Sequence, residues 1–438
     1  MKRWFLPAML LAACAGVARA AVAPAELDAA VAALAPRVIE WRRDFHSHPE
    51  LGNREFRTSG RVAEHLESLG LEVHTGIAHT GVVALLRGAL PGPTIMLRAD
   101  MDALPVTERT DVPFRSTATA EFRGRQVGVM HACGHDTHTA MLMGAAQILA
   151  GLRDRLPGTV MFVFQPAEEG APEREQAGAP LMIQEGLFTI AKPDAIIGMH
   201  VGSDMHTGTV GLRSGPFMSG SDFFRIVVTG RQSHAAKPWA GIDPIVASAQ
   251  IVNALQAIVS RQTDITELPV VISIGAINGG VRHNIIPDSV EMLGTIRTFG
   301  AASREQTIAR LRNTVEHAAA ASGASATIEL DPAPNPAVDN DPALTARVIR
   351  SLRAAVGNDS VRMLGLKTVA EDFPYYSRQA PSVYYWVGIT PPEQDLATAP
   401  DNHSDRFYVD ENGLSVGLKS MLYVAVDFLQ GAGADQSP

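Results

Sequence analysis

The chain has 438 residues, of which 46% are hydrophobic and 19% are charged, and its formal net charge is −9. This length is too great for one simple core and is sufficient for two or three domains. The composition is ordinary for a globular protein. An acidic balance without a long basic run gives nucleic-acid binding little electrostatic support, so we expect no nucleic-acid partner.

The N-terminus has the pattern of an export signal. Residues 1–3 are a basic start, residues 4–13 are apolar, and residues 18–20 (ARA) form a small-x-small cleavage site. We therefore predict a signal peptide over 1–20 and a mature protein that is exported to a bacterial periplasm or secreted. The string LAAC ending at Cys14 also resembles a lipoprotein box, so a lipid-anchored form is the alternative. No apolar stretch is long enough for a transmembrane span.

In the first half of the mature chain, predicted helices alternate with short apolar strands. A helix from 24 closes at the string HSHPE, and a second runs over 57–69. The remaining elements of this half are strands at 82–87, 94–99, 159–164 and 195–199, a turn at 90–93, and helices at 139–152 and from 181. This alternation predicts a catalytic α/β domain with a mixed, largely buried sheet.

The order of elements changes after residue 212. Strands at 223–229, 270–277, 289–298 and 326–330 and helices at 243–260 and 303–322 follow the order β-α-β-β-α-β. That order is the ferredoxin-like unit, so we predict an inserted α+β lid domain over 213–331. The chain then returns to the catalytic domain, whose two parts are 21–212 and 332–438, with a helix from 341, a strand through 383–388 and a helix over 412–428.

The string HACGHDTH at 131–138 places one thiol and three imidazoles within eight residues. Soft sulfur and borderline imidazole suit zinc or a similar divalent ion. The only other cysteine is Cys14, and if it is cleaved away or lipidated as the signal predicts, Cys133 has no intrachain disulfide partner. Cys133 is therefore a candidate metal ligand; a buried inert thiol is the alternative.

Two acidic pairs follow predicted strands. Asp100 and Asp102 stand at i and i+2, so an extended chain points both to one side. Glu168 and Glu169 are adjacent and face opposite ways if extended, which would let one bind metal while the other faces substrate. A carboxylate beside metal ligands is what metal-assisted hydrolysis needs to handle a proton. The alternative for each pair is a solvated acidic turn.

Three further histidines are weak candidates when each is taken alone. His200 ends the strand predicted over 195–199, a position where α/β sheets bind ligands, while His403 and His234 lie in predicted loops. Each could be a structural histidine. The sequence has no Gly-x-Ser-x-Gly elbow of a serine hydrolase and no phosphate-binding loop.

Taken together, the strings MHACGHDTHTAMLMGAA, QPAEEG, GRQSHAAKPWAGIDPI and NIIPD resemble the metal-dependent amidohydrolase branch of the aminoacylase and glutamate carboxypeptidase family. This branch includes hippurate hydrolases, N-acyl-amino-acid amidohydrolases and plant auxin-conjugate hydrolases. The resemblance covers essentially the whole mature chain.

The resemblance implies a role for each candidate. Glu168 matches the general base, and Asp102 matches an acid that orients a metal ligand. Asp100 stands where more distant relatives have a ligand histidine. The positions that match the family's metal ligands are those of Cys133, His135, Glu169, His200 and His403.

Three positions of the lid domain also match the family. His234 matches a histidine that completes the active site of the partner subunit, and Asn284 matches a position near the substrate carboxylate. Arg282 departs from the family, since many relatives have Thr-Ala-x before that asparagine, so we expect it to affect substrate preference. A second departure is AEDF at 370–373 in place of the commoner SEDF.

We therefore expect an exported homodimer, paired through the lid domain, that cleaves N-acyl amino acids or similar small conjugates. One or two divalent ions per subunit are implied, with zinc first and manganese, cobalt or nickel as alternatives. A dipeptidase or carboxypeptidase would use the same site. The third possibility is a non-catalytic exported binding protein for amino-acid derivatives.

Overall fold

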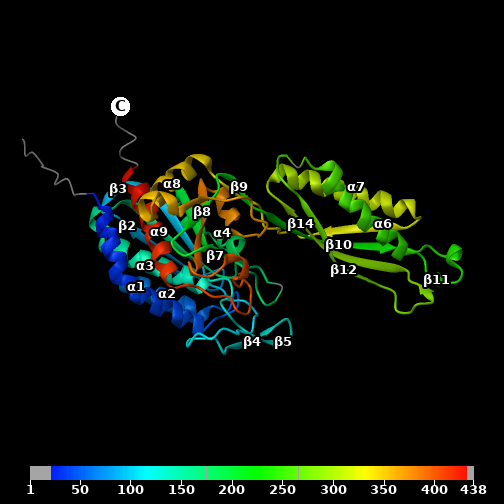
Figure 1. Cartoon of the computed structure of the whole chain (residues 1–438), viewed down its shortest axis with the longest axis horizontal. Helices are drawn as coiled ribbons and strands as arrows, with labels where there is room; N and C mark the ends of the chain where they lie inside the picture. Colours follow the sequence, from blue (N-terminus) through cyan, green and yellow to red (C-terminus); the bar gives the residue numbers. More distant parts are fainter. Residues whose placement is uncertain (1–20, 174, 265, 432–438) are drawn as a thin grey trace, which may run out of the picture.

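The structure is a computed structural model, and it describes residues 21–173, 175–264 and 266–431. The predicted signal peptide and Cys14 lie outside the described residues. Figure 1 shows two bodies along the longest axis, a larger α/β body and a smaller body built around one sheet. No helix within the described ranges is both long and apolar enough to cross a membrane.

The larger body is built on an eight-stranded mixed sheet. Its central strands run parallel, β6 with β3, β3 with β7 and β7 with β18, whereas β2 pairs antiparallel with β1 and β6. In spatial order the strands are β1 (Glu72–Ile77), β2 (Gly81–Arg87), β6 (Pro157–Gln165), β3 (Leu90–Asp100), β7 (Ala195–His206), β18 (Ser382–Thr390), β8 (Val210–Leu212) and β17 (Val361–Met363). The predicted mixed α/β sheet is confirmed.

Both faces of this sheet are covered, because its strands are apolar on both sides. Val82, Ala84 and Leu86 of β2 join the core on one face, while Val83 and Leu85 join the core on the other. The helices of the first face are α1 (Pro24–Ser47), α2 (Phe56–Ser68), α3 (His135–Gly151), α8 (Pro342–Val356) and α9 (Asn412–Gly431). The second face carries α4 (Gly178–Gln184), α5 (Leu187–Ile190) and the 3₁₀ helix η5 (Phe373–Arg378).

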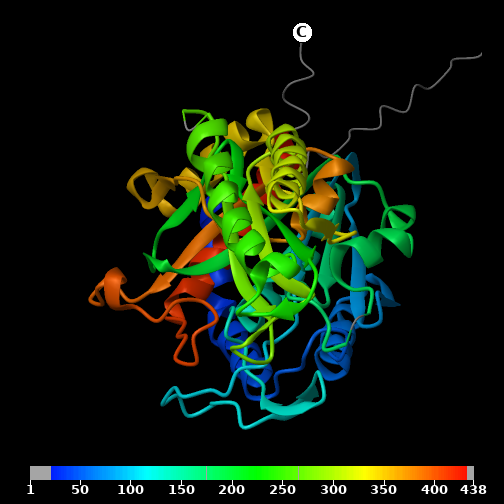
Figure 2. The same cartoon turned by 90° about the vertical axis from the view of Figure 1, so that its right-hand side faces the viewer.

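The smaller body is a four-stranded antiparallel sheet in the order β12-β14-β10-β15. Apolar residues alternate along its strands and pack against two helices on one face, as Figure 2 shows from the end of the long axis. The elements are β10 (Gly220–Thr229), α6 (Pro244–Ala257), η3 (Ile258–Gln262), β12 (Val271–Gly279), β14 (Ser289–Thr298), α7 (Ala301–Ala321) and β15 (Ser325–Leu330). This confirms the ferredoxin-like fold; the domain boundaries at 213 and 331 stay predictions.

Short elements make up the rest of the described chain. A hairpin of β4 and β5 projects from the larger body, and β11 with β13 lies at the far end of the smaller one (Figure 1). Their bounds are β4 (Thr119–Phe122), β5 (Arg125–Gly128), β9 (Gly215–Met218), β11 (Ser233–His234), β13 (Ile285–Ile286), β16 (Val338–Asn340), η1 (Arg153–Arg155), η2 (Pro238–Ala240), η4 (Asn358–Ser360) and η6 (Leu396–Thr398).

Several predicted element ends are wrong. The turn expected at 90–93 lies within β3, because the chain already pairs with β6 at Leu90. The helix expected from 139 begins at His135, after Gly134 adopts a left-handed φ of 93°. The strand expected to end before His200 continues to His206, because β18 still pairs alongside it there. Glu168 and Glu169 lie in a turn and not in an extended segment.

Candidate metal centre and active site

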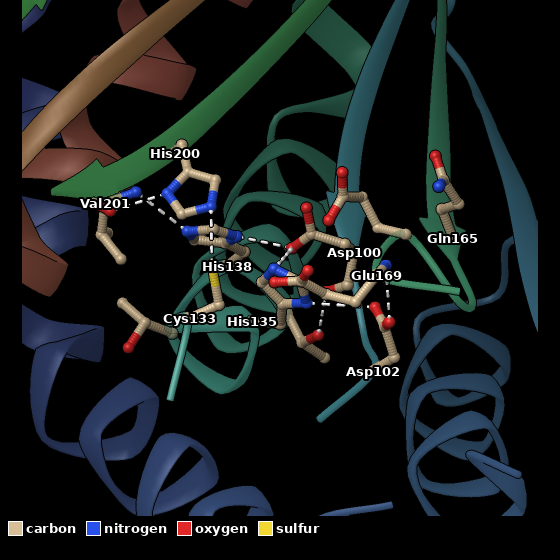
Figure 3. A network of polar contacts seen from close by, with 12 residues as sticks. Asp100, Asp102, Cys133, His135, His138, Gln165, Glu169, His200 and Val201 are labelled. Carbon is tan, nitrogen blue, oxygen red and sulfur yellow. Dashed lines mark hydrogen bonds and ion pairs between the residues drawn. The ribbon is translucent and has the colours of Figure 1, made fainter. Parts of the chain in front are cut away.

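Five candidate ligand side chains from four segments of the chain lie close together. Figure 3 shows four of them, Cys133, His135, Glu169 and His200. Cys133 Sγ lies 3.3 Å from His200 Nε2 and 3.2 Å from His403 Nε2. His403 Nε2 also lies 2.7 Å from Glu169 Oε1. His135 completes the group, since its ring offers a nitrogen within 4.8 Å of the ligand atoms of Cys133 and His200. All five candidate metal ligands are therefore brought together.

Local backbone conformation explains how neighbouring residues share one site. Gly134 separates Cys133 from His135, and its left-handed φ of 93° suits a residue without a side chain. A Cβ at this glycine would lie 2.4 Å from a methyl carbon of Val201. On the other side, His403 has a φ of 70°, and its backbone N–H donates to Ala132 O at 2.7 Å. These two bends bring both loops against β7.

Hydrogen bonds to one ring nitrogen leave the other free for a metal. His200 Nδ1 donates to Val201 O at 2.7 Å, so its Nε2 carries the lone pair that faces Cys133. His135 Nδ1 lies 3.1 Å from Asp102 Oδ1, while its buried Nε2 has no hydrogen-bond partner within the described chain. A carboxylate or carbonyl behind a histidine is the usual support of a metal ligand. The Nε2 of His135, which has no hydrogen bond and only Asp100 Oδ1, at 3.7 Å, within ion-pair distance among the described residues, therefore fits a metal site.

The Cys133 thiol also fits a cation. Burial and the carboxylates of Glu169 and Glu168 raise the pKa of this thiol well above its ordinary value. A thiolate at this place therefore needs a positive charge beside it, and a coordinated thiol is deprotonated by the ion. A donor set of one sulfur, three imidazoles and a carboxylate suits zinc and related divalent ions.

Asp100 and His138 have a structural role, because their polar side-chain atoms bond to other groups of the protein. His138 Nδ1 lies 2.6 Å from Asp100 Oδ1, and its Nε2 accepts the Val201 N–H at 2.9 Å. Because both ring nitrogens are engaged, His138 has no lone pair left for a metal. Asp100 Oδ2 accepts from Arg98 Nη1 at 2.5 Å. Asp100 thus links the ligand-bearing helix α3 to β3.

Glu168 lies in the same turn as Glu169 but has different neighbours. Its Oε1 is 3.4 Å from the Asp372 backbone N, and its carboxylate is grouped with those of Glu371 and Asp372 on one side and with His135 and Glu169 on the other. Burial, followed by the negative charges of Glu371, Glu169 and Asp372, raises the pKa of Glu168 well above its ordinary value. A carboxyl group with a raised pKa can accept a proton and give it back, as a general base requires.

A fully buried arginine behind Glu168 was missed by the sequence analysis. Arg98 Nη2 donates to Glu371 Oε1 at 2.8 Å and to Asp372 Oδ1 at 3.0 Å, and Arg98 Nε donates to Gln165 Oε1 at 2.9 Å. Its charge compensates carboxylates that could not otherwise be buried together. The string AEDF at 370–373 was the only signal, and it did not point to Arg98.

A cavity of about 340 Å³ lies beside the metal donors, and its lining includes Glu168 and four of the five candidate ligands, Cys133, Glu169, His200 and His403. Arg297 of β14 faces it from the ferredoxin-like body, half-buried and without a hydrogen bond or ion pair among the described residues. Burial lowers the pKa of Arg297, because no carboxylate compensates its charge. The lining also includes Trp386, whose Nε1 is buried without a partner. Sequence reasoning missed Arg297, since nothing around it forms a motif.

The three predicted lid residues lie elsewhere. His234 lies in β11, at the far end of the ferredoxin-like body in Figure 1, and Arg282 and Asn284 directly precede its partner strand β13. None of the three lines the cavity. His234 is exposed, and its Nδ1 accepts the Ala236 N–H at 3.0 Å. Asn284 O accepts the Ala235 N–H at 3.1 Å. The structure therefore does not bring these three residues to the cavity beside the metal donors.

Comparison with known proteins shows the family to which the chain belongs. Residues 96–426 match the model of peptidase family M20/M25/M40, and the chain belongs to this family. It is 40% identical over 395 residues to thermostable carboxypeptidase 1 of Saccharolobus solfataricus, covering 89% of this chain and 95% of the relative. It is 38% identical over 402 residues to N-acetylcysteine deacetylase of Bacillus subtilis, covering 90% and 97%.

A solved structure agrees with these relatives. A Bacillus subtilis protein described as a dinuclear metal binding peptidase of the M20 family superposes with a TM-score of 0.74 at 34% identity, covering 91% of this chain and 99% of that one. The protein is therefore an enzyme of a metal-dependent hydrolase family, and the reading as a non-catalytic binding protein is set aside.

Proposed function

We propose that the protein hydrolyses the amide bond of N-acyl amino acids. One observation carries the proposal: the cavity is lined by Glu168 and four of the five metal donors from the larger body, and by Arg297, whose side chain has no partner among the described residues, from the smaller body. An N-acyl amino acid has an amide to cleave and a carboxylate that would satisfy an arginine, which binds carboxylates in a planar fork. The deacetylase relative from Bacillus subtilis supports this substrate class.

The metal site would be formed by Cys133, His135, Glu169, His200 and His403. We propose one or two divalent ions per subunit, with zinc favoured by the sulfur and imidazole donors and manganese, cobalt or nickel as alternatives. When bound, such an ion polarises the amide carbonyl and lowers the pKa of a water molecule.

Side chains of the protein would carry out proton transfer, orient a metal ligand and bind the substrate. Glu168 takes the proton of the attacking water and returns it to the leaving nitrogen. Asp102 keeps His135 in the orientation that exposes Nε2 to the cluster. Arg297 orients the substrate carboxylate, so that the amide faces Glu168. His234 would add a donor for the developing oxyanion from the partner subunit of a homodimer, with Asn284 and Arg282 near the substrate.

A second candidate is a dipeptidase or carboxypeptidase activity, which the carboxypeptidase relative from Saccharolobus solfataricus favours. Such substrates have the same C-terminal carboxylate but a free α-amino group. A panel of hippurate, N-acetyl amino acids and the corresponding free dipeptides, assayed with zinc, manganese, cobalt and nickel, separates the two. Hydrolysis of dipeptides alone would contradict the amidohydrolase proposal.

The role of Arg297 is tested by the same panel. Amidation of the substrate carboxylate should raise KM for the wild type by about 10²-fold, because charge-assisted hydrogen bonds at a buried site contribute about 1.5–3 kcal/mol. The variant Arg297→Met should bind the acid and its amide equally well. If Arg297→Met keeps the full preference for the acid, another group binds the carboxylate.

Export and domain division remain part of the proposal. We propose cleavage after residue 20 and release to the periplasm or medium, with a lipid anchor at Cys14 as the alternative. The mature chain would then have catalytic parts at 21–212 and 332–438 and a lid at 213–331. Mass spectrometry of the mature protein decides between a start near Ala21 and an acylated Cys14.

A further inference from the structure

Glu55 is a fully buried carboxyl group directly beneath the turn that carries Glu168 and Glu169. Its relative exposure is 0%. Glu55 Oε1 accepts the Ala167 N–H at 2.8 Å, and the Thr80 hydroxyl oxygen lies 2.6 Å from Oε2. No role in the proposed chemistry accounts for this residue. Because burying a carboxyl group is costly, its contacts must serve a purpose in the folded protein.

The turn is held by two acidic side chains. Glu55 accepts the amide of Ala167, and Asp102 Oδ2 accepts the amide of Glu169 at 3.0 Å. The amide of Gly170 is satisfied within the turn, by Ala167 O at 3.2 Å. The two acidic side chains therefore fix the amides immediately before Glu168 and at Glu169, which sets the direction of both glutamate side chains.

The backbone around Glu55 is unusually rich in left-handed conformations. Ala167 has a φ of 50°, Ala78 of 51°, Asn53 of 60° and His79 of 73°. These are four of the six non-glycine residues with positive φ in the part of the chain that the structure describes. Such conformations are disfavoured for residues with a Cβ and persist only where surrounding contacts impose them. The hydrogen bond from Ala167 to Glu55 is such a contact.

The segment that carries Glu55 also packs directly against the turn. A Cβ at Gly52 would lie 2.3 Å from Gly170 O and 2.9 Å from the Cβ of Ala167. The absence of a side chain at Gly52 therefore lets the two segments approach closely. The turn has no room to relax toward this segment.

We propose that Glu55 is a positioning residue, whose acceptance of the Ala167 amide holds the strained turn that aims Glu168 at the substrate and Glu169 at the metal. The inference rests on the proposed function of these two glutamates. Burial and the neighbouring charge of Asp102 raise the pKa of Glu55 to about 8, so this carboxyl group keeps its proton at neutral pH. Glutamine is therefore its close isostere and can still accept the Ala167 amide.

The test compares Glu55→Ala with Glu55→Gln. Misplacement of a reacting group by about 1 Å can cost about 10²-fold. We therefore expect Glu55→Ala to lower kcat about 10- to 100-fold with little change in KM. Zinc affinity should fall about tenfold or more, as for other supports of metal ligands. Glu55→Gln should stay within about threefold of wild type in both measurements.

The matched control is Glu50→Ala. Glu50 accepts the backbone N–H groups of Arg57 at 2.9 Å and Thr58 at 2.8 Å in the first turn of α2, the helix that begins directly after Glu55. Its side chain has no hydrogen bond to the turn that carries Glu168 and Glu169. This variant should lose stability without losing kcat or zinc affinity. If Glu55→Ala does not fold, Gly52→Ala provides a second variant. Its added methyl group would clash with Gly170 O of the turn, so kcat and zinc affinity should both fall.

The outcomes are distinct. The inference is wrong if folded Glu55→Ala stays within threefold of wild type, or if Glu55→Gln loses as much as Glu55→Ala. If Glu55→Ala does not fold, Gly52→Ala is measured in its place. The inference is then wrong if Gly52→Ala keeps the wild-type kcat and zinc affinity. A wild type that cleaves no N-acyl amino acid would contradict the proposed function instead. The zinc affinities, measured by competition with a chelator, would then still decide the role of Glu55.

Discussion

At the scale of single residues, Glu168 and Glu169 are adjacent in sequence but differ in their contacts. Glu169 lies 2.7 Å from His403 among the metal donors, whereas Glu168 lies between these donors and the carboxylates of Glu371 and Asp372. We predict that Glu168→Gln retains the metal and lowers kcat by about 10²–10⁴, the usual contribution of a general base. Metal content and kcat of the same preparation are measured, with the exposed Glu173→Gln of the same loop as the control.

This prediction has a clear contrary result. Turnover near the wild-type value in Glu168→Gln, with metal retained, would show that another group accepts the proton. Loss of the metal together with turnover would assign Glu168 to the ligands.

Cys133 provides the second prediction at this scale. Its sulfur lies within 3.3 Å of both His200 and His403, so the thiolate would be central to the donor set. A hydroxyl is a poor replacement for thiolate on a soft or borderline ion. Cys133→Ser should therefore lose metal during dialysis under conditions where the wild type keeps it. Equal stoichiometry and affinity in both proteins would make Cys133 a core residue only.

The sequence could predict those site residues that belong to motifs. Cys133 and His135 are close in sequence and have ligand chemistry, and the resemblance supplied the distant His200 and His403. Arg98 and Arg297 could not be predicted in this way. Each is a single arginine within a strand, and its importance arises from what faces it in the folded protein: Glu371 and Asp372 for Arg98, and an open cavity for Arg297.

At the scale of elements, hydrophobic periodicity predicted the long helices and the long buried strands but missed the short strands and placed several ends wrongly. β7 shows why. Its apolar run ends at Met199, yet residues up to His206 still pair with β18. Backbone pairing depends on the neighbouring strand and not on hydrophobicity, so polar residues can extend a strand. The hairpin of β4 and β5 was missed for the same reason, since half its residues are exposed.

The junction of α1 and α3 yields a prediction about pH. His46, at the end of α1, lies 2.8 Å from Asp136 in the first turn of α3 and 3.1 Å from Glu108. Burial and Arg42 disfavour the charged ring, but the hydrogen bonds and charges of Asp136 and Glu108 outweigh them and raise the pKa of His46. Because α3 carries His135, this ion pair also anchors the metal centre.

Proton linkage determines how the stability contributed by His46 changes with pH. A histidine whose pKa is raised in the folded state stabilises the folded protein. This contribution is fully present when the pH is below the unfolded pKa of about 6.5, and it is lost as the pH rises through the folded pKa. His46→Gln should cost about 3–5 kcal/mol of unfolding free energy at pH 6, the usual cost of breaking a buried pair. The difference from wild type should shrink toward pH 9.

Denaturant unfolding from pH 6 to 9 measures this difference. The control is His48→Gln, which replaces an exposed histidine two residues further on. A difference between wild type and His46→Gln that does not change with pH would contradict the charged pair and leave only a packing role for His46.

At the scale of the whole molecule, the two bodies contribute unequally to the cavity. The larger body carries the donors and Glu168, mostly on loops that follow the strands, while the ferredoxin-like body contributes Arg297 and Ser221. The far end of that body, with His234, is directed away from the site of its own protomer (Figure 1). A catalytic role for His234 therefore requires a second protomer, related by two-fold symmetry.

A mixing experiment tests this arrangement. Subunits carrying His234→Ala and subunits carrying Glu168→Gln should each be inactive alone. In a mixed dimer one site receives both lesions and the other receives neither. Random exchange makes about half of the dimers mixed, and each has one intact site, so about a quarter of wild-type activity should return. A monomeric active enzyme, or inactive dimers verified as mixed, would exclude the role of His234 in trans.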